Sequence, residues 1–273
     1  MAKSSYLRGA DYRSIHNLVG ECRELGDDPR SWRGHLLGWA ARVAGAPVAT
    51  EYEAQLRPTV IREVTGWGWE RSGLEIEYWL AMNEEFARRG FDFNPMLAAY
   101  IAATERGEGP CLSRPDMVPD ADWYPTEYFQ SYHGPSRADV MTYCILPQRN
   151  GMSMGVVLVR PIGDRDFSKR AKAVVGAAHG LIAPLVGGVL AGYSDPSPST
   201  LSPRTRQVLR CALEGDSDKQ IAARLGMARN TVNHYVKRIY DHFDVQSRPE
   251  LLARWVRRGW GGRFAWTDSN EAD

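Results

Sequence analysis

The chain has 273 residues, of which 43% are hydrophobic and 25% charged, and its net charge is +1. These are ordinary values for globular proteins, so they exclude a mainly disordered or fibrous chain. The length exceeds that of one typical domain and suits two.

The charge is distributed unevenly along the chain. Residues 200–263 hold 13 Lys and Arg against 6 Asp and Glu, a net charge of +7, whereas the rest holds 21 against 27, a net charge of −6. A basic module joined to an acidic one is typical of a phosphate-binding domain carried by a domain that does not bind nucleic acid.

The cysteines and the N-terminus indicate the compartment. Cys22, Cys111, Cys144 and Cys211 are far apart and form no CxxC motif, so we expect neither a zinc site nor a disulfide framework. The N-terminus lacks an apolar signal core, and no stretch approaches the roughly 18 apolar residues of a membrane span. We therefore expect a soluble cytoplasmic protein with no membrane partner, no metal and no cofactor.

The first 190 residues alternate helical and strand patterns. In chain order, the predicted elements are a helical region ending near Gly45, strands at 46–55 and 58–69, helices at 74–89, 95–105 and 123–132, strands at 139–147 and 152–161, and a helix at 168–190. Asn150-Gly151 is a strong hairpin signal between the last two strands, and Pro184 is expected to kink the last helix. The mixture predicts an α+β domain.

The last helix of this region carries a family resemblance. The segment DFSKRAKAVVGAAHGLIAPLVGGVL, from Asp166, is similar to the closing helix of GAF-like sensor domains in LuxR-type regulators, and residues 28–190 resemble such a domain in their patterning. The resemblance implies a GAF/PAS-like α+β fold class. The expected boundaries are a sensor domain at 1–192, a proline-interrupted linker at 193–200, an all-α four-helix domain at 201–262 and a disordered tail at 263–273.

Residues 201–255 predict four short helices. Ser202-Pro203 is a helix start, Ser217 and Gln220 form a capping box that begins a second helix, and Gly226 supplies the turn before a third. The third helix has apolar residues on one stripe at Val232, Val236, Ile239 and Phe243. A second capping box, at 247–250, begins a fourth helix that is expected to bury Leu251, Leu252, Trp255 and Val256.

The segment from Leu201 to Trp255 resembles the LuxR-type helix-turn-helix over its whole length. The resemblance implies a DNA-binding transcription regulator. Three residues depart from the family pattern: Thr205 replaces an acidic residue, Ala228 replaces the usual Ser cap of the recognition helix, and Tyr235 stands where His is frequent. These departures concern capping and the DNA sequence read, because none of them lies on the apolar stripe.

The third helix presents a polar face opposite its apolar stripe. Asn233, His234 and Lys237 occupy the positions that usually touch bases in the family, and they could pair with adenine or guanine in the major groove. The residues expected to contact the DNA backbone are Lys219, Arg229, Asn230, Thr231 and Arg238.

A single short helix reads few bases, so such domains usually bind double-stranded DNA as dimers. We therefore expect a homodimer. The candidate interfaces are the helix at 168–190 and the fourth helix with Arg254, Trp255 and Arg258, and core packing within one chain is the alternative for both. RNA polymerase is a further candidate partner of a transcription regulator.

Several input signals are excluded by missing motifs. A phosphorylated receiver domain needs a lysine, and none occurs between Lys3 and Lys169. The Gly-Lys-Ser/Thr loop of ATPases is absent, and so is the Trp followed four residues later by Tyr that is typical of acyl-homoserine-lactone receptors.

An aromatic-rich middle remains as a candidate pocket for a small-molecule effector, with ordinary core packing as the alternative. Its residues are Trp67, Trp69, Tyr78, Trp79, Trp123, Tyr128 and Tyr143. His133 and Cys144 have no partner at ligand spacing, so we expect no metal or haem there.

Two other functions stay open. A sigma-factor-like protein has a similar helix-turn-helix, but it also needs a basic helical region to open promoter DNA, and the N-terminal part here is acidic and contains strand patterns. An enzyme with an appended DNA-binding domain is the other alternative, although no nucleophile-elbow, metal or paired-carboxylate motif is visible. We expect no enzymatic activity.

Overall fold

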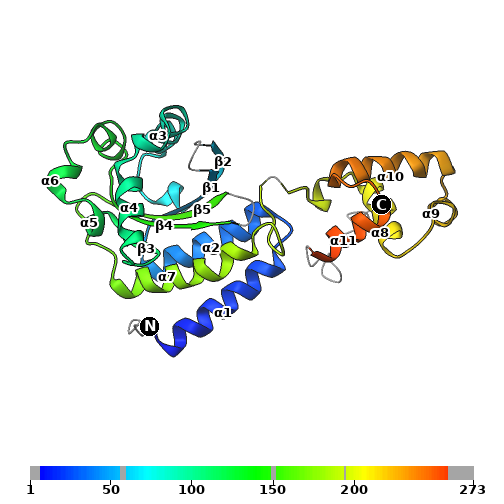
Figure 1. Cartoon of the computed structure of the whole chain (residues 1–273), viewed down its shortest axis with the longest axis horizontal. Helices are drawn as coiled ribbons and strands as arrows, with labels where there is room; N and C mark the ends of the chain where they lie inside the picture. The colour runs from blue at the N-terminus through cyan, green and yellow to red at the C-terminus, as the bar shows by residue number, and fades with distance from the viewer. Residues whose placement is uncertain (1–6, 56–59, 149–151, 194, 258–273) are drawn as a thin grey trace. The chain divides into compact units, whose positions relative to one another are not determined.

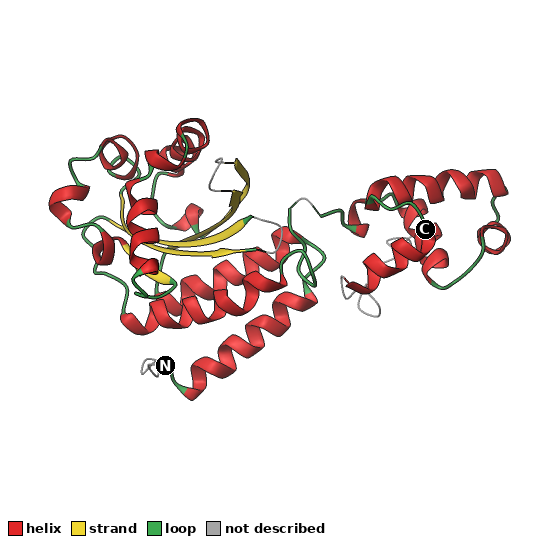
Figure 2. Cartoon of the chain, viewed as in Figure 1, coloured by secondary structure: helices red, strands yellow, loops and turns green. Residues whose placement is uncertain are grey.

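The structure is a computed structural model that describes residues 7–55, 60–148, 152–193 and 195–257. The chain divides into two compact units, here called the N-terminal unit (Met1–Arg23 with Arg30–Val186) and the C-terminal unit (Glu24–Pro29 with Gly187–Asp273). Among the described residues, only those of the N-terminal unit form strands (Figure 2). The linker at 193–200 and the other expected boundaries stay predictions, and the expected disordered tail lies outside the described residues.

The N-terminal unit is built on one five-stranded sheet of order β2-β1-β5-β4-β3, in which every neighbouring pair is antiparallel. Its strands are β1 (Val48–Gln55), β2 (Val60–Trp67), β3 (Cys111–Ser113), β4 (Ala138–Pro147) and β5 (Ser153–Pro161). The predicted hairpin is confirmed, because Pro147 pairs with Ser153 and the Gln148 N–H donates to the Met152 carbonyl at 2.7 Å.

Helices cover both faces of this sheet (Figure 1). The helix α7 (Lys169–Ile182) lies on one face with α1 (Gly9–Glu24) and α2 (Pro29–Ala44), and α3 (Ile76–Arg89) and α4 (Pro95–Glu105) lie on the other. Short helical segments complete the unit: η1 (Trp69–Arg71), η2 (Phe91–Phe93), α5 (Arg114–Met117), α6 (Asp120–Trp123), η3 (Phe129–His133) and η4 (Ala183–Leu185). One antiparallel sheet covered by helices is the expected α+β class.

Alternation along the strands assigns side chains to the two faces. On β1, Glu51 and Glu53 point to the face covered by α2, where the Arg33 guanidinium binds both carboxylates. Thr50 and Tyr52 point to the opposite face, beneath α3. The buried Arg33–Glu51–Glu53 cluster and the residues Thr50 and Tyr52 therefore lie on opposite faces of β1.

Three sequence-based elements need correction. The helix expected at 168–190 ends at Ile182, because Pro184 removes an N–H donor and Gly187 adopts a left-handed φ of 78°. The helix expected at 123–132 is replaced by α6 and the π-helical turn η3. The strand β3 was not predicted, because three residues are too few to show alternation.

The C-terminal unit contains the four predicted helices. They are α8 (Pro203–Leu213), α9 (Asp218–Leu225), α10 (Arg229–Phe243) and α11 (Arg248–Arg257), and the short η5 (Pro198–Thr200) precedes them. Apolar side chains form its core, in which Leu209, Ile221, Val232, Ile239 and Phe243 are almost fully buried.

The longest described helices, α1 and α2, have 16 residues each. Across the described residues, no helix combines the length and the apolar character that a membrane span requires.

Candidate nucleic-acid interface and cavity

The face of α10 that points to solvent holds the predicted base contacts. Val232, Ile239 and Phe243 are buried on the opposite side, and Val236, which was expected in the same stripe, is half-buried. All eight residues predicted to contact DNA are exposed: Lys219, Arg229, Asn230, Thr231, Asn233, His234, Lys237 and Arg238. One residue comes from α9 and the other seven from α10, so the structure brings them onto consecutive helices of one small domain.

The cations among these residues are unneutralised. Within the described part of the chain, no hydrogen bond or ion pair engages the side chains of Lys219, Arg229, Lys237 or Arg238. Five other arginines of the unit do have partners: Arg204, Arg210, Arg224, Arg248 and Arg254.

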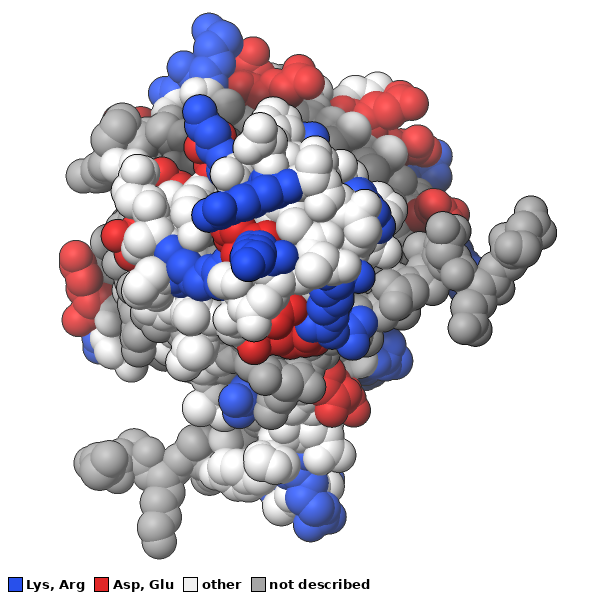
Figure 3. Space-filling model, turned by 90° about the vertical axis from the view of Figure 1, so that its right-hand side faces the viewer, with Lys and Arg blue, Asp and Glu red and all other residues white. Residues whose placement is uncertain are grey.

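Three of these partnered arginines lie close to acidic side chains, and one of them is Arg224, whose Nη1 lies 2.9 Å from Asp216 Oδ2. Arg210 Nε lies 3.1 Å from a Glu214 oxygen, and Arg248 Nη2 lies 3.1 Å from a carboxylate oxygen of Asp218. Lys and Arg side chains gather on the face of this unit that is turned to the viewer in Figure 3, with acidic side chains between them. The unpaired cations on α9 and α10 are therefore available to phosphates.

Local capping positions α9 and α10. The predicted capping box is confirmed at the start of α9, where the Ser217 N–H donates to Gln220 Oε1 at 2.8 Å. Gly226 ends α9 with a φ of 62°, a left-handed conformation that glycine adopts without steric cost. At the start of α10, Ala228 provides no side-chain cap, and no described side chain takes over that role. The Thr231 N–H donates to the Ala228 carbonyl at 3.0 Å, and no described side chain caps the amide groups of Arg229 and Asn230.

The start of α8 shows how Thr205 compensates for the missing acidic residue. Ser202 caps the helix by accepting a hydrogen bond from the Thr205 N–H, and the two hydroxyl groups lie 2.7 Å apart. Thr205 is 1% exposed, so the contact between the two hydroxyl groups at the start of α8 is buried in the protein.

The fourth helix differs from its prediction in two respects. The Glu250 side chain accepts a hydrogen bond from the Gln246 N–H at 2.7 Å and not from the Ser247 N–H. The prediction of a reciprocal bond in the second capping box is therefore wrong, whereas the bond from the Glu250 N–H to the Ser247 hydroxyl is present. Leu252 and Val256 are 37% and 73% exposed rather than buried, because the core contacts only the neighbouring face that carries Leu251 and Trp255. Of the predicted interface residues, Trp255 is buried, Arg254 donates to the Phe243 carbonyl, and Arg258 lies outside the described residues.

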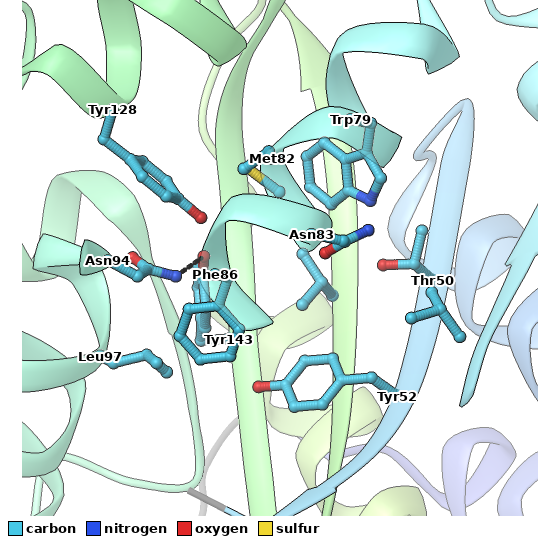
Figure 4. A pocket seen from close by; sticks show the side chains of 12 residues that line it. Thr50, Tyr52, Trp79, Met82, Asn83, Phe86, Asn94, Leu97, Tyr128 and Tyr143 are labelled. Atoms are coloured by element: carbon cyan, nitrogen blue, oxygen red, sulfur yellow. Dashed lines mark hydrogen bonds between the residues drawn. The ribbon is translucent and has the colours of Figure 1, made fainter. Parts of the chain in front are cut away.

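A cavity lies between α3 and the sheet in the N-terminal unit (Figure 4). Trp79, Met82, Asn83 and Phe86 of α3 line it, at the i, i+3, i+4 and i+7 spacing of one helix face. The remaining lining residues come from the strands, from α4 and from the segments before α4 and η3: Thr50, Tyr52, Val64, Asn94, Leu97, Tyr128, Tyr143 and Val157. The volume of the cavity that the centre of a water molecule can occupy is about 40 Å³.

The aromatic residues proposed from the sequence divide between cavity and surroundings. Trp79, Tyr128 and Tyr143 line the cavity. The other four do not line it: Trp67 and Tyr78 are 36% and 43% exposed, Trp69 packs against the core, and Trp123 is buried with its indole N–H donating to Asp139 at 3.0 Å. Composition alone could not separate these groups, because both share the aromatic residue types.

The lining residues that sequence reasoning missed are mostly not aromatic. Thr50 and Tyr52 share one face of β1, and Asn83 and Phe86 share one face of α3 with Trp79. Those spacings were visible in the sequence as alternation and helical periodicity. What was not visible is that this strand and this helix face each other.

The hydroxyl groups in the cavity stay neutral. Burial raises the pKa of Tyr52, Tyr128 and Tyr143 above the ordinary range. Asn94 uses both ends of its amide: its oxygen accepts from the Met96 N–H at 2.9 Å and its nitrogen donates to the Tyr143 hydroxyl at 3.1 Å. Asn94 therefore caps α4 and orients one wall of the cavity.

Two histidines are buried in the N-terminal unit. His133 is fully buried among the rings of Trp79, Trp123 and Tyr128, and neither ring nitrogen has a hydrogen-bond partner among the described residues. His179 Nδ1 lies 3.0 Å from Cys144 Sγ. Burial lowers the pKa of each histidine to about 3. The described residues contain no group of three or more His, Cys, Asp or Glu arranged to hold a metal ion.

The family match of this chain lies in the C-terminal unit. Residues 199–255 match the family described as bacterial regulatory proteins, luxR family. A probable helix-turn-helix-type transcriptional regulator, GfsR of Streptomyces halstedii, is 38% identical over 63 residues, which are 23% of this chain and 26% of that protein. The probable transcriptional regulatory protein NarL of Mycobacterium tuberculosis is 37% identical over 101 residues, which are 35% of this chain and 47% of that protein.

The chain thus covers less than half of the length of these curated relatives. Among solved structures, the chain is similar to the N-acylhomoserine lactone dependent LuxR family transcription factor CepR2 of Burkholderia cenocepacia, with 10% identity, 63% of this chain and 95% of that chain covered, and a TM-score of 0.43. The C-terminal domain of this chain is a helix-turn-helix domain of the luxR family of bacterial regulatory proteins.

Proposed function

We propose that this protein is a transcriptional regulator that reads a specific operator through α10. The observation that carries the proposal is the exposed polar face of α10, whose cations lack partners within the described residues. A helix of this kind fits the major groove of B-DNA, which is about 12 Å wide. A merely solvated face would more often pair its cations with neighbouring carboxylates, as Arg210 does.

The side chains divide by the part of DNA they would touch. Asn233, His234 and Lys237 project from the middle of α10 and contact base edges, with Asn suited to adenine and Lys to guanine. Lys219, Arg229, Asn230, Thr231 and Arg238 contact the phosphates and fix the register of the helix. The open amide groups at the start of α10 favour a phosphate as well, because the helix dipole is positive there.

The active form in this proposal is a homodimer that uses α11. Leu252 and Val256 leave an apolar strip exposed on α11, one turn apart, and burying it against a second copy removes that surface from water. The helix α7 is the weaker choice, because most of its apolar side chains already pack within the N-terminal unit. Substitution of Val256 by Lys is expected to shift the sedimentation of the protein with operator DNA from dimer to monomer.

The N-terminal unit is proposed to bind a small-molecule effector and to control DNA binding, without catalysing a reaction. Its cavity is lined by apolar and aromatic side chains with a few polar groups, as ligand sites usually are. DNA as the partner places the protein in the cytoplasm, with RNA polymerase as the machinery that it regulates.

Selection of bound fragments from random double-stranded DNA tests the central proposal. The full chain is expected to enrich one sequence, arranged as two half-sites with two-fold symmetry. A double variant, Asn233→Ala with Lys237→Ala, serves as the control and is expected to enrich no sequence while keeping its helical content. Equal recovery of all sequences by the unaltered chain contradicts operator reading.

A further inference from the structure

We propose that the cavity beneath α3 binds a compact, electrically neutral molecule of about one ring that offers a hydrogen-bond acceptor to Asn83. This inference rests on the proposed role of the N-terminal unit as an effector-binding domain, and it names the chemical class of that effector. It follows from the charge, the unused hydrogen-bonding groups and the dimensions of the cavity.

Charge is the first constraint. The twelve lining residues include no Lys, Arg, His, Asp or Glu. The tyrosines among them stay protonated at neutral pH, because burial raises the pKa of each. A carboxylate or ammonium group brought into this site would lose its hydration without meeting an opposite charge, which costs far more than burying a neutral group. The site therefore selects a neutral ligand.

Asn83 supplies the second constraint. Its Nδ2 is buried and has no hydrogen-bond partner among the described residues. Figure 4 shows its amide among the side chains of the cavity, whereas the Asn94 amide is occupied by the Tyr143 hydroxyl. A buried donor left unpaired is unfavourable, so a ligand that carries a carbonyl, ether or ring-nitrogen acceptor gains a favourable contact there.

The dimensions give the third constraint. The roughly 40 Å³ open to the centre of a water molecule is the space of about three waters, at about 10–15 Å³ each, so it limits the ligand to one small ring at most and excludes a long chain. Trp79, Phe86 and Tyr52 provide flat apolar surfaces around that space. A planar ring matches them, because offset or edge contacts between rings are favourable.

Gly155 keeps the Tyr52 ring out of the space. It lies directly opposite Tyr52 in the β1–β5 register, and a Cβ atom at this position would stand 2.1 Å from Tyr52 Cζ. The glycine therefore allows the ring to lie flat across β5. A side chain at position 155 would push the Tyr52 ring away from β5 and into the cavity that the ring lines.

The experiment uses three probes of similar size with the full chain: benzamide, which is neutral with an acceptor, benzoate, which is charged, and ethylbenzene, which is neutral without an acceptor. Saturation-transfer NMR measures the binding of each. Benzamide is expected to bind at least about tenfold more tightly than benzoate and about threefold to tenfold more tightly than ethylbenzene. Addition of an octyl chain to the ring of benzamide is expected to abolish binding.

Three variants locate the binding. Leu97→Trp fills the cavity and is expected to abolish binding of benzamide, and Leu80→Trp, at a residue of α3 that is 51% exposed, is the matched control that keeps it. Asn83→Leu changes little volume, and it is expected to remove the preference for benzamide over ethylbenzene. If Leu97→Trp loses the helical circular dichroism of the folded chain, Asn83→Leu still tests whether the probe binds in the cavity.

Equal binding of benzoate and benzamide, unchanged binding by Leu97→Trp in a folded protein, or an unchanged preference in Asn83→Leu overturns the inference. No binding of any probe by the unaltered chain also overturns it. Titration of operator DNA with the same preparation separates the two proposals, because loss of DNA binding bears on the proposed function and loss of probe binding bears on the cavity.

Discussion

Charged side chains play opposite parts in the two units. In the C-terminal unit, apolar side chains form the core, and Lys219, Arg229, Lys237 and Arg238 stand in solvent without partners among the described residues. In the N-terminal unit, charged side chains such as Arg33, Glu51 and Glu53 are fully buried. The difference teaches that the same residue types serve the proposed DNA recognition in one unit and join elements of the fold in the other.

The buried charges of the N-terminal unit join segments that are distant in the chain. Arg33 Nη2 lies 2.7 Å from Glu53 Oε2, which connects α2 to β1. Arg114 Nη2 lies 3.3 Å from Asp139 Oδ1, which connects α5 to β4, and the same carboxylate accepts from the Tyr124 hydroxyl at 2.8 Å. The four helices of the C-terminal unit, in contrast, follow one another within 55 residues, between 203 and 257. The comparison yields four predictions.

The largest expected effect is loss of the buried cation in the N-terminal unit. Arg33→Met leaves two carboxylates buried without their guanidinium, and removal of one partner from a buried ion pair typically costs about 3–5 kcal/mol. Urea unfolding of the full chain measures this change. Arg88→Met is the matched control, because Arg88 is 69% exposed and pairs with Glu85 on the surface. Equal stability of the two variants would show that the buried charges do not hold the fold together.

Acidification is expected to weaken the N-terminal unit next. Burial lowers the folded-state pKa of His133 and His179 to about 3 from an ordinary 6.5. Below pH 6.5 both histidines become protonated in the unfolded chain but stay neutral in the folded chain. The free energy of unfolding therefore falls from its value above pH 6.5 as the pH drops toward 3. Each group contributes at most about 1.4 kcal/mol per pH unit.

Urea unfolding between pH 7 and pH 5 measures this loss before most carboxylates titrate. His133→Phe, which suits the surrounding rings, is expected to reduce the slope by about half. His16→Gln is the control, because His16 is exposed, and its slope is expected to match that of the unaltered chain. An unchanged slope in His133→Phe contradicts the assignment.

Removal of an unpaired cation from the C-terminal unit is expected to impair DNA binding rather than folding. Lys237→Ala should weaken binding to the selected operator by about 1–3 kcal/mol and leave the unfolding midpoint unchanged. Titrations at one fixed salt concentration measure the change. Arg210→Ala removes a cation that is already paired with Glu214, so we expect a smaller loss in that variant. Unchanged affinity in Lys237→Ala would refute the role of this residue.

The smallest effect is expected at the uncapped start of α10. Ala228→Ser supplies a hydroxyl oxygen that accepts a hydrogen bond from a free amide N–H of the first turn. This cap should stabilise the C-terminal unit by about 1 kcal/mol. Thermal unfolding followed by circular dichroism measures the gain. Ala223→Ser, at an exposed interior position of α9, is the control and should give no gain. If both substitutions act alike, the gain does not come from capping.

The C-terminal unit could be read from the sequence because its determinants are local. The Ser217–Gln220 capping box, Gly226 and the stripe of Val232, Ile239 and Phe243 each act within a few residues. Helix starts, turns and buried faces follow from such short-range contacts. Even here, the exposure of Leu252 and Val256 depended on which face of α11 meets the core.

The sequence by itself determined the four helices, the polar face of α10 and the hairpin that pairs β4 with β5. Only the tertiary structure decided that α3 faces β1 across a cavity, that Gly155 lies under Tyr52, and that Arg33 meets Glu51 and Glu53. The physical reason is that local hydrogen bonds and periodicity act over a few residues, whereas cavities and buried ion pairs arise between elements whose pairing no short pattern encodes.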